Sequence, residues 1–427
     1  MHQNRGRKRR KVIRQTAAIT AALKQFEGLY PETIELSLGR IQTVLETLGN
    51  PQTKLPPVIH VAGTNGKGST CAFLRAMAEA AGLRVHVFTS PHLVRFNERI
   101  RLAGDLVSDD DLLGWLNRTY TALQGRPITH FEATTAAAFL AFSEVPADLL
   151  ILEVGLGGRF DATNVVDQPA LSVITPVDYD HKQFLGTDLA KIAGEKAGII
   201  KSGKPVVSAI QTRVCGDVIT QRADRLAAPL HVLNLQDLEQ MPPEVALSGG
   251  HQRYNAALAG LALRTLRHPA IDSEAILNGA RTATWPARMQ KLAEGPITRQ
   301  AGKAEVWLDG GHNPHAARAL SAMLRQRSGR TVMVSAMMAS KDHGGFFHPF
   351  QNVAASVHTC PNASGHAGAD PVELAMKARA FIPSATAHSS FEMALAAAIA
   401  EDPDRILICG SLYLAGDVLM ANAESPN

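Results

Sequence analysis

The residues with the most evident chemistry lie in a short glycine-rich segment, Gly63-Thr-Asn-Gly-Lys-Gly-Ser69. A β-rich run (58–62) precedes it and a helix-forming run (70–81) follows, so the segment joins a strand to a helix. Such a loop can wrap a phosphate chain, because glycines allow close approach, a helix N-terminus offers unpaired N–H groups and Lys67 adds a positive charge. The sequence therefore predicts a nucleoside triphosphate site. Its spacing is not the common G-x-x-x-x-G-K-[ST] pattern, since Gly68 separates Lys67 from Ser69.

Three further polar residues follow predicted strands and could hold a metal ion. Ser90 and Glu153 offer the oxygen ligands that Mg²⁺ prefers, and His181, beside two aspartates, would be an unusual ligand. Each also has an ordinary structural explanation. Ser90 could be a turn or capping residue, Glu153 could accept from loop amides, and a lone histidine is more often structural.

The elements that must position these residues alternate between strands and helices. The first series has predicted strands at 58–62, 85–89, 149–153, 171–175 and 205–210, with helices such as 134–143 and 189–200 between them. A second series has strands at 305–308, 331–336, 356–359 and 406–409, with helices at 316–325, 371–381 and 391–400. This alternation predicts an α/β protein with doubly wound parallel sheets, in which ligands bind at the carboxyl ends of strands.

We predict three segments along the chain: a basic, disordered tail (1–20), a larger domain (21–294) and a smaller domain (295–427). The boundary is placed at the turn Glu294-Gly-Pro296. Residues 1–15 hold seven basic residues and no acidic one, which leaves 36 basic and 39 acidic residues in the rest of the chain. Such a tail could contact nucleic acid, but the rest of the chain is nearly neutral, so the sequence does not predict a nucleic-acid-binding function.

Composition restricts the class of protein further. No apolar run approaches the roughly 20 residues that span a bilayer, so we expect no membrane partner. The four cysteines are scattered, as is typical of reduced thiols, and a cytoplasmic monomer is expected. Lys196 lies late in an amphipathic helical run, where a lysine is by default a solvated surface charge.

Taken together, a series of ordered motifs resembles the folylpolyglutamate synthase and dihydrofolate synthase family of the Mur ligase superfamily. Besides the glycine loop, the motifs are Ser90-Pro-His-Leu93, Arg95-Phe-Asn-Glu-Arg-Ile100, Phe131-Glu132, Glu153-Val-Gly-Leu-Gly-Gly-Arg-Phe-Asp-Ala-Thr-Asn164, Asp180-His181, Glu195-Lys-Ala-Gly-Ile199, Asp309-Gly-Gly-His-Asn-Pro314 and Gly410-Ser-Leu-Tyr-Leu414. The resemblance runs from about Leu23 to Leu419. It implies a Mur-ligase-type P-loop domain that binds ATP, followed by a smaller Rossmann-like α/β domain for glutamate ligation. Gly311 departs from the usual alanine, and Ala339-Ser-Lys341-Asp342 is a loose version of a Lys-Asp motif.

The resemblance also implies roles for individual residues. Lys67, Glu153, His181 and Lys196 would be catalytic, and Lys196 would be carboxylated by CO₂, which reverses the surface interpretation. ATP would be held by Asn65, Gly66, Lys67, Gly68, Ser69, Asn255, Arg288, Asp309 and His312. Mg²⁺, with two sites expected, would be held by Ser90, Glu153 and His181. The pteridine substrate would be held by Glu35, Leu36, Ser37, Thr129, His130, Phe131, Glu132, Phe160, Asp161 and Ala162.

The implied reaction is ATP-dependent amide formation between L-glutamate and dihydropteroate or the γ-carboxylate of a folate. Phe131-Glu132-Ala133-Thr134 and Glu35-Leu36-Ser37 favour a bifunctional enzyme over one that only extends polyglutamate. A Mur-type ligase of peptidoglycan precursors is a weaker alternative, because only 62 residues precede the glycine loop, too few for a UDP-binding domain. A non-catalytic nucleotide switch is the remaining alternative.

Overall fold

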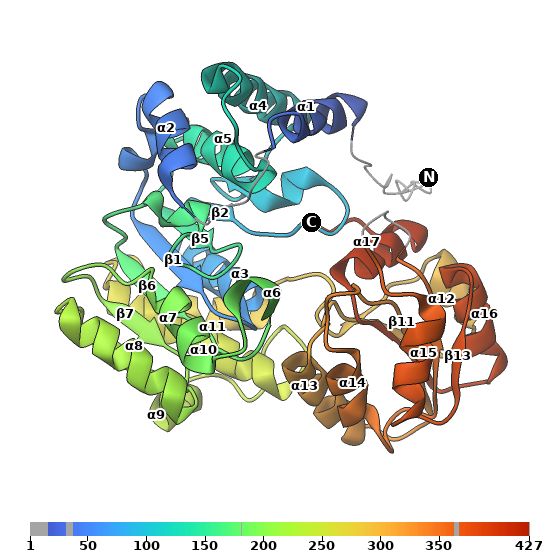
Figure 1. Cartoon of the computed structure of the whole chain (residues 1–427). Coiled ribbons are helices and arrows are strands. Elements are labelled where there is room, and N and C mark those ends of the chain that lie inside the picture. The colour runs from blue at the N-terminus through green and yellow to red at the C-terminus, as the bar shows by residue number, and fades with distance from the viewer. Residues whose placement is uncertain (1–15, 31–36, 181, 363–366, 427) are drawn as a thin grey trace, which may run out of the picture.

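The computed structural model describes residues 16–30, 37–180, 182–362 and 367–426. The chain forms two α/β bodies that lie side by side (Figure 1). The first is built on an eight-stranded sheet and the second on a six-stranded sheet. Among the described residues, no helix is long and apolar enough to cross a membrane.

The central strands of the first sheet run parallel, so their carboxyl ends lie along the same edge of the sheet. Its order is β4-β3-β2-β5-β1-β6-β7-β8, and its bounds are β1 Val58–Ala62, β2 Val85–Phe88, β3 Ile100–Leu102, β4 Asp105–Leu106, β5 Leu149–Glu153, β6 Leu171–Ile174, β7 Val206–Ser208 and β8 Leu230–Val232. The pairs are parallel except β2–β3 and β3–β4, which are antiparallel. Val61 of β1 pairs with Glu153 of β5, so the glycine loop and Glu153 leave the sheet together.

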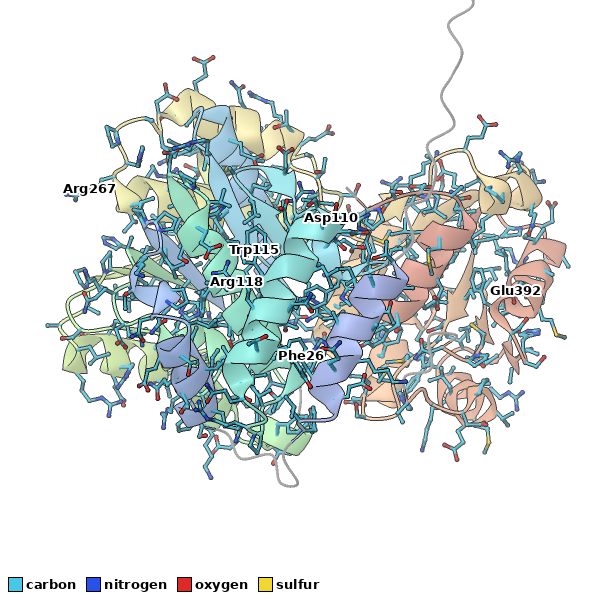
Figure 2. All side chains as sticks on the ribbon, turned by 90° about the horizontal axis from the view of Figure 1, so that it is seen from above. Phe26, Asp110, Trp115, Arg118, Arg267 and Glu392 are labelled. Atoms are coloured by element: carbon cyan, nitrogen blue, oxygen red, sulfur yellow. The ribbon has the colours of Figure 1, made fainter. Side chains whose placement is uncertain are left out.

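Helices cover both faces of this sheet. One face carries α1 Ala17–Glu27, α2 Gly39–Thr47, α4 Asp109–Leu123, α5 His130–Glu144, α7 Leu189–Ala197 and α8 Arg213–Arg225. The other face carries α3 Lys67–Ala80, α10 Gly250–Leu266 and α11 Ser273–Thr282. Figure 2 shows α1 and α4 as the outer layer, with Phe26 and Trp115 both buried. Short elements complete this body: α6 Lys182–Leu185, α9 Leu235–Glu239, η1 Pro51–Thr53, η2 Phe96–Arg99 and η3 Ala162–Val165.

The second body repeats the arrangement on a smaller scale. Its sheet has the order β13-β12-β11-β14-β10-β9, with β9 Gln290–Lys291, β10 Glu305–Leu308, β11 Thr331–Ser335, β12 Ser356–Thr359, β13 Ala385–Ala387 and β14 Arg405–Cys409. Only β9 is antiparallel to its neighbour in the described part of this sheet. One face packs on α13 Pro314–Arg325, α14 His343–Phe347, η4 His348–Phe350 and α15 Pro371–Arg379, and the other on α12 Pro296–Ala301, α16 Phe391–Ala400 and α17 Leu412–Ala421.

The predicted α/β class with two parallel-rich sheets is confirmed. Several element bounds differ from the prediction, and two helix starts matter most. Helix α3 begins at Lys67 rather than at residue 70, because the glycine loop runs directly into its first turn. Helix α1 begins at Ala17, so the last residues of the predicted tail are helical. Strand β9 already pairs with β10 at residues 290–291, and the domain boundary at 294/295 stays a prediction.

Candidate active site

The glycine loop makes a tight entry into α3. Gly66 caps the helix with φ 85°, a left-handed conformation that favours glycine. A Cβ at this position would lie 2.6 Å from Oδ1 of Asn255. A Cβ at Gly68 would lie 2.9 Å from the Trp285 ring. A larger residue at either glycine would therefore push Asn255 or Trp285 away from the loop.

Two lysines converge on the carbonyl oxygen that begins this loop. Nζ of Lys67 donates to the Gly63 oxygen at 3.2 Å, and Nζ of Lys196 donates to the same oxygen at 3.0 Å. Lys196 is 4 % exposed, so the default interpretation of it as a surface residue is wrong. Burial, and then the positive charge of Lys67, lower the pKa of Lys196 to about 7. Its amine is therefore partly neutral at physiological pH.

A buried carboxylate faces the loop from β5, the strand that pairs with β1 in the sheet. Glu153 ends β5, is 4 % exposed, and accepts a hydrogen bond from the Ser90 backbone N–H at 3.2 Å. Burial raises the pKa of Glu153, and the nearby Lys67 opposes that shift. The hydroxyl of Ser90 and the carboxylate of Glu153 are hard oxygen donors, which suit Mg²⁺. His181 lies outside the described residues, and no cluster of three or more metal-ligating side chains occurs among those that are described.

One cavity of about 580 Å³ gathers these groups between the two bodies. This volume is typical of a site for a small-molecule ligand. Its lining includes every residue predicted to hold ATP, together with Ser90 and Glu153: Asn65, Gly66, Lys67, Gly68, Ser69, Asn255, Arg288, Asp309 and His312. The structure thus brings together residues from widely separated parts of the chain.

The second body contributes a loop that follows β10. Asp309 is buried, and its carboxylate accepts from the backbone N–H of Met289 at 2.8 Å and of Gly311 at 2.6 Å. Asn313 caps α13 and donates through Nδ2 to Oδ1 of Asn65 at 2.9 Å and to Oδ2 of Asp180 at 3.1 Å. Asn313 therefore joins the two bodies directly beside the phosphate loop.

Sequence reasoning gave no role to several groups at this junction. Lys341 Nζ lies 2.6 Å from the Asp180 carboxylate. Asp178 forms an ion pair with Arg318 and a hydrogen bond with the His315 ring, both from α13. These contacts depend on how the two bodies meet. The sequence alone indicates only that polar residues follow the strands, and it does not indicate which of them pair.

The residues predicted to hold the pteridine surround the segment after β5. The Phe131 ring covers Gly155, where a Cβ would lie 2.4 Å from the ring, and Gly155 lines the cavity. Asp161 is buried, caps η3 and accepts from Leu156 N and from both the backbone and the hydroxyl of Thr163.

The remaining predicted pteridine residues have varied surroundings. Glu132 forms a reciprocal cap with Thr129 at the start of α5 and pairs with Arg40 at 3.0 Å. Phe160 is exposed, Ala162 is buried, and His130 and Ser37 are half-buried. Burial and the charge of Arg99 lower the pKa of His130 to about 4. Glu35 and Leu36 lie outside the described residues.

Comparison with known proteins agrees with this geometry. Residues 287–412 match the family model described as Mur ligase, glutamate ligase domain. The chain is 35% identical to the dihydrofolate synthase/folylpolyglutamate synthase of Bacillus subtilis, over 90% of this chain and 94% of that protein. The chain belongs to the dihydrofolate synthase/folylpolyglutamate synthase family. It is accordingly an ATP-dependent ligase of the Mur type.

Two similar solved structures carry ligands. Escherichia coli FolC in complex with DHPP and ADP superposes with a TM-score of 0.82 at 30% identity, covering 96% of this chain and 98% of that chain. A bifunctional folylpolyglutamate synthase/dihydrofolate synthase from Yersinia pestis, complexed with AMPPNP and a Mn ion, has a TM-score of 0.81 at 32% identity. That match covers 96% of this chain and 99% of the other.

Proposed function

We propose that the protein joins L-glutamate to dihydropteroate and to the γ-carboxylate of folates, and that it drives both reactions with ATP. The observation that best supports this proposal is a single cavity, lined by Lys67, by the buried Glu153 and by Gly155, the residue that the Phe131 ring covers. A triphosphate on the loop and an acceptor reaching past Phe131 would meet at this point. Membership of the family supports this arrangement of substrates.

The chemistry requires activation because an oxide ion is a poor leaving group. A carboxylate oxygen of the acceptor attacks the γ-phosphorus of ATP, the bond to the β-phosphate oxygen breaks, and ADP leaves. The resulting acyl phosphate is attacked at carbon by the glutamate amine. Inorganic phosphate then departs with the former carboxylate oxygen, the nitrogen loses a proton, and an amide remains.

The chain's own groups would hold the triphosphate and offset the charge on the transferring phosphoryl group. The backbone amides at the start of α3 and the Lys67 ammonium face the phosphates in this proposal. Asn255, Arg288, Asp309 and His312 would hold the rest of the nucleotide. Asn313 connects the loops of the two bodies. If the two bodies stay together over the bound ATP, they would keep water away from the acyl phosphate.

Ser90 and Glu153 would hold Mg²⁺, with His181 as a further ligand and a second metal site close by. The metal would neutralise phosphate charge and position the triphosphate. This Mg²⁺ site is supported by the side-chain oxygens of Ser90 and Glu153, which line the same cavity as the phosphate loop. Glu153 is already oriented by the Ser90 amide, so little rearrangement is needed to present its other oxygen.

We further propose that Lys196 is carboxylated. Its buried amine has a pKa lowered to about 7, so a substantial fraction has the free lone pair that attacks CO₂. The new N–C bond forms as the amine loses a proton, and a cation beside Lys67 becomes an anion. The acceptor is held by Ser37, Thr129, His130, Phe131, Glu132, Phe160, Asp161 and Ala162, with Glu35 and Leu36, in this proposal.

The four cysteines are buried and free, which suits a reducing compartment, and we propose a cytoplasmic monomer. Glutamate-dependent ADP release tests the activity, with dihydropteroate, tetrahydrofolate and tetrahydrofolate diglutamate compared as acceptors. We expect turnover with all three. Turnover with the folates alone would indicate an enzyme that only extends polyglutamate, and none with any acceptor would overturn the proposal.

A further inference from the structure

A histidine is buried in the middle of the central strand of the first sheet. His60 belongs to β1, all five residues of which are buried, and it is 0 % exposed. Side chains alternate between the two faces of a strand, so His60 points to the same face as Val58, which packs in the core beneath α5. A buried polar ring needs a hydrogen-bond partner. None of the roles proposed above uses this histidine.

The partner of His60 is the hydroxyl of Thr163, which is bonded in turn to Asp161. Oγ1 of Thr163 lies 2.8 Å from Nε2 of His60 and donates to Oδ1 of Asp161 at 2.5 Å. A hydroxyl has one proton, so its oxygen accepts from His60, and Nε2 is the protonated ring nitrogen. Burial, and then the charge of Lys201, lower the pKa of His60 to about 3, so the ring is neutral at physiological pH. The hydrogen bonds therefore run in one direction, from His60 through Thr163 to the carboxylate.

The carboxylate at the end of these bonds holds a glycine-rich loop, residues 155–161. Oδ1 of Asp161 also accepts from the backbone N–H of Thr163 at 3.0 Å, and Oδ2 accepts from that of Leu156 at 2.9 Å. The backbone N–H of Asp161 donates to the Gly158 oxygen at 3.2 Å. The loop contains three glycines, which allow many conformations, and none of its residues is in a helix or a strand. Its conformation therefore depends on the contacts that Asp161 makes.

Both ends of this loop belong to the proposed acceptor site. Gly155, at its start, lies under the Phe131 ring and lines the nucleotide cavity. Phe160 and Asp161, at its end, are among the residues that would hold the pteridine. The bond from the Leu156 N–H to Asp161 joins the two ends. A carboxylate that turned away from this bond would therefore change how the two ends of the acceptor site face each other.

The Thr163 hydroxyl also helps to keep this carboxylate charged. Burial raises the pKa of Asp161, and the hydrogen bond from the Thr163 hydroxyl is the first of several that oppose the shift. Hydrogen bonds from a hydroxyl to a charged carboxylate are short and strong. Because His60 donates to the hydroxyl oxygen, the hydroxyl proton is directed at Asp161, and each bond polarises the next.

We propose that His60 and Thr163 are positioning residues of the acceptor site, and that they act through Asp161 by fixing the 155–161 loop in the conformation that binds the pteridine. This role rests on the function proposed above and deepens it. The groups proposed to hold ATP lie on other segments, namely the glycine loop, α10 and residues 288–312. The two positioning residues therefore govern affinity for the acceptor and leave affinity for ATP unchanged.

The first test compares Thr163→Val, which removes the hydroxyl at nearly constant volume, with Thr163→Ser, which keeps it. Loss of one hydrogen bond to a charged group predicts that the KM values for dihydropteroate and tetrahydrofolate rise roughly tenfold, while kcat and the KM for ATP stay nearly constant. Thr163→Ser should recover most of the loss. Thr119→Val is the matched control, because Thr119 is equally buried on the outer helix α4 and its hydroxyl has no partner within the described chain (Figure 2).

The second test asks whether the two residues act through one series of bonds. His60→Leu removes the donor but leaves the bond from Thr163 to Asp161, so the KM for the acceptor should rise only several-fold. Adding His60→Leu to Thr163→Val should raise the KM no further, because the hydroxyl through which His60 acts is already absent. Effects that multiply in the double variant would contradict the proposal. An unchanged acceptor KM in Thr163→Val, or an equal change in every constant including the KM for ATP, would overturn it.

A binding measurement separates this role from the ligase activity itself. Calorimetry with a nonhydrolysable ATP analogue gives the affinity for dihydropteroate without turnover, and binding of the analogue shows that each variant is folded. Thr163→Val should bind dihydropteroate roughly tenfold more weakly than the unaltered protein. If Thr163→Val does not bind the analogue, His60→Leu, which leaves every bond of Asp161 in place, provides the same comparison.

The outcomes distinguish the two proposals. If the unaltered protein binds dihydropteroate with the expected loss in Thr163→Val but shows no glutamate-dependent ADP release, the ligase proposal fails while the positioning role stands. Equal affinities for dihydropteroate in the unaltered protein, Thr163→Val and His60→Leu would reject the positioning role alone. An unaltered protein that binds neither dihydropteroate nor tetrahydrofolate would overturn both.

Discussion

Two loops face each other across the nucleotide cavity, and they are built in different ways. The phosphate loop of the first body carries charge that its own residues do not neutralise, because Lys67 and Lys196 both donate to the neutral carbonyl of Gly63. The loop after β10 in the second body holds a carboxylate whose two oxygens are already bonded, since Asp309 accepts from Met289 and Gly311. The first loop is therefore suited to stabilise a moving phosphoryl group, and the second to orient what the first one binds.

The difference predicts unequal effects of substitution in the two loops. Charge aimed at the reacting atoms acts on kcat, whereas hydrogen bonds that position a loop act mainly on substrate affinity and on closure. The first loop should thus be sensitive to loss of a single amine. The second should tolerate loss of a contact with a smaller decrease in rate.

Removal of the Lys67 amine should have the largest effect. Lys67→Ala takes away the full positive charge at the start of α3, and glutamate-dependent ADP release should fall by at least about 10³-fold. Circular dichroism should show an unchanged fold, because the side chain contributes only hydrogen bonds to loop carbonyls. A variant that retains near-normal turnover would show that the first loop does not carry the chemistry.

Removal of the Lys196 amine, which reaches the first loop from α7, should have an intermediate effect that a small molecule can reverse in part. Lys196→Ala should reduce turnover by about 10²-fold, and acetate or formate should restore part of it by supplying the missing carboxylate. Carboxylation needs the neutral amine, so with a pKa of about 7 the modified fraction should rise as the pH increases through 7. Carbon-13 NMR of protein exposed to labelled CO₂ should detect the carbamate. Full activity of an unmodified Lys196 would contradict this role.

A substitution in the second loop should have the smallest effect. Asn313→Ser keeps a side-chain oxygen to cap α13 but removes the two bonds donated to Asn65 and Asp180. Each such bond contributes about 0.5–1.5 kcal/mol, so kcat/KM for ATP should fall several-fold and kcat less. Steady-state kinetics at varied ATP concentration measure both. A loss as large as that of Lys67→Ala would remove the distinction between the loops.

The phosphate loop could be predicted from sequence because its signal is local. Strand, glycines, lysine and helix follow one another, and their backbone requirements are visible in the residue types at Gly66 and Gly68. The carboxyl-end rule for parallel strands also placed Ser90 and Glu153 beside the glycine loop at one edge of the first sheet, and all three line one cavity.

Long-range properties could not be predicted in this way. The local pattern around Lys196 indicates an exposed lysine, and its burial arises from packing against the glycine loop, which lies more than a hundred residues earlier. The roles of Asn313, Asp180 and Lys341 depend on how two separate sheets meet. The start of helix α1, at residues 17–20 of the predicted tail, was missed because its amphipathic pattern is short and follows a basic run.

The central claim is that the phosphate loop makes an acceptor carboxylate reactive by phosphorylating it, and the fate of the carboxylate oxygens tests this directly. Dihydropteroate labelled with ¹⁸O in both carboxylate oxygens is turned over with ATP and L-glutamate, and the inorganic phosphate is analysed by mass spectrometry. Formation of an acyl phosphate predicts one ¹⁸O atom in each phosphate released. Phosphate free of ¹⁸O, with amide still formed, would contradict the account.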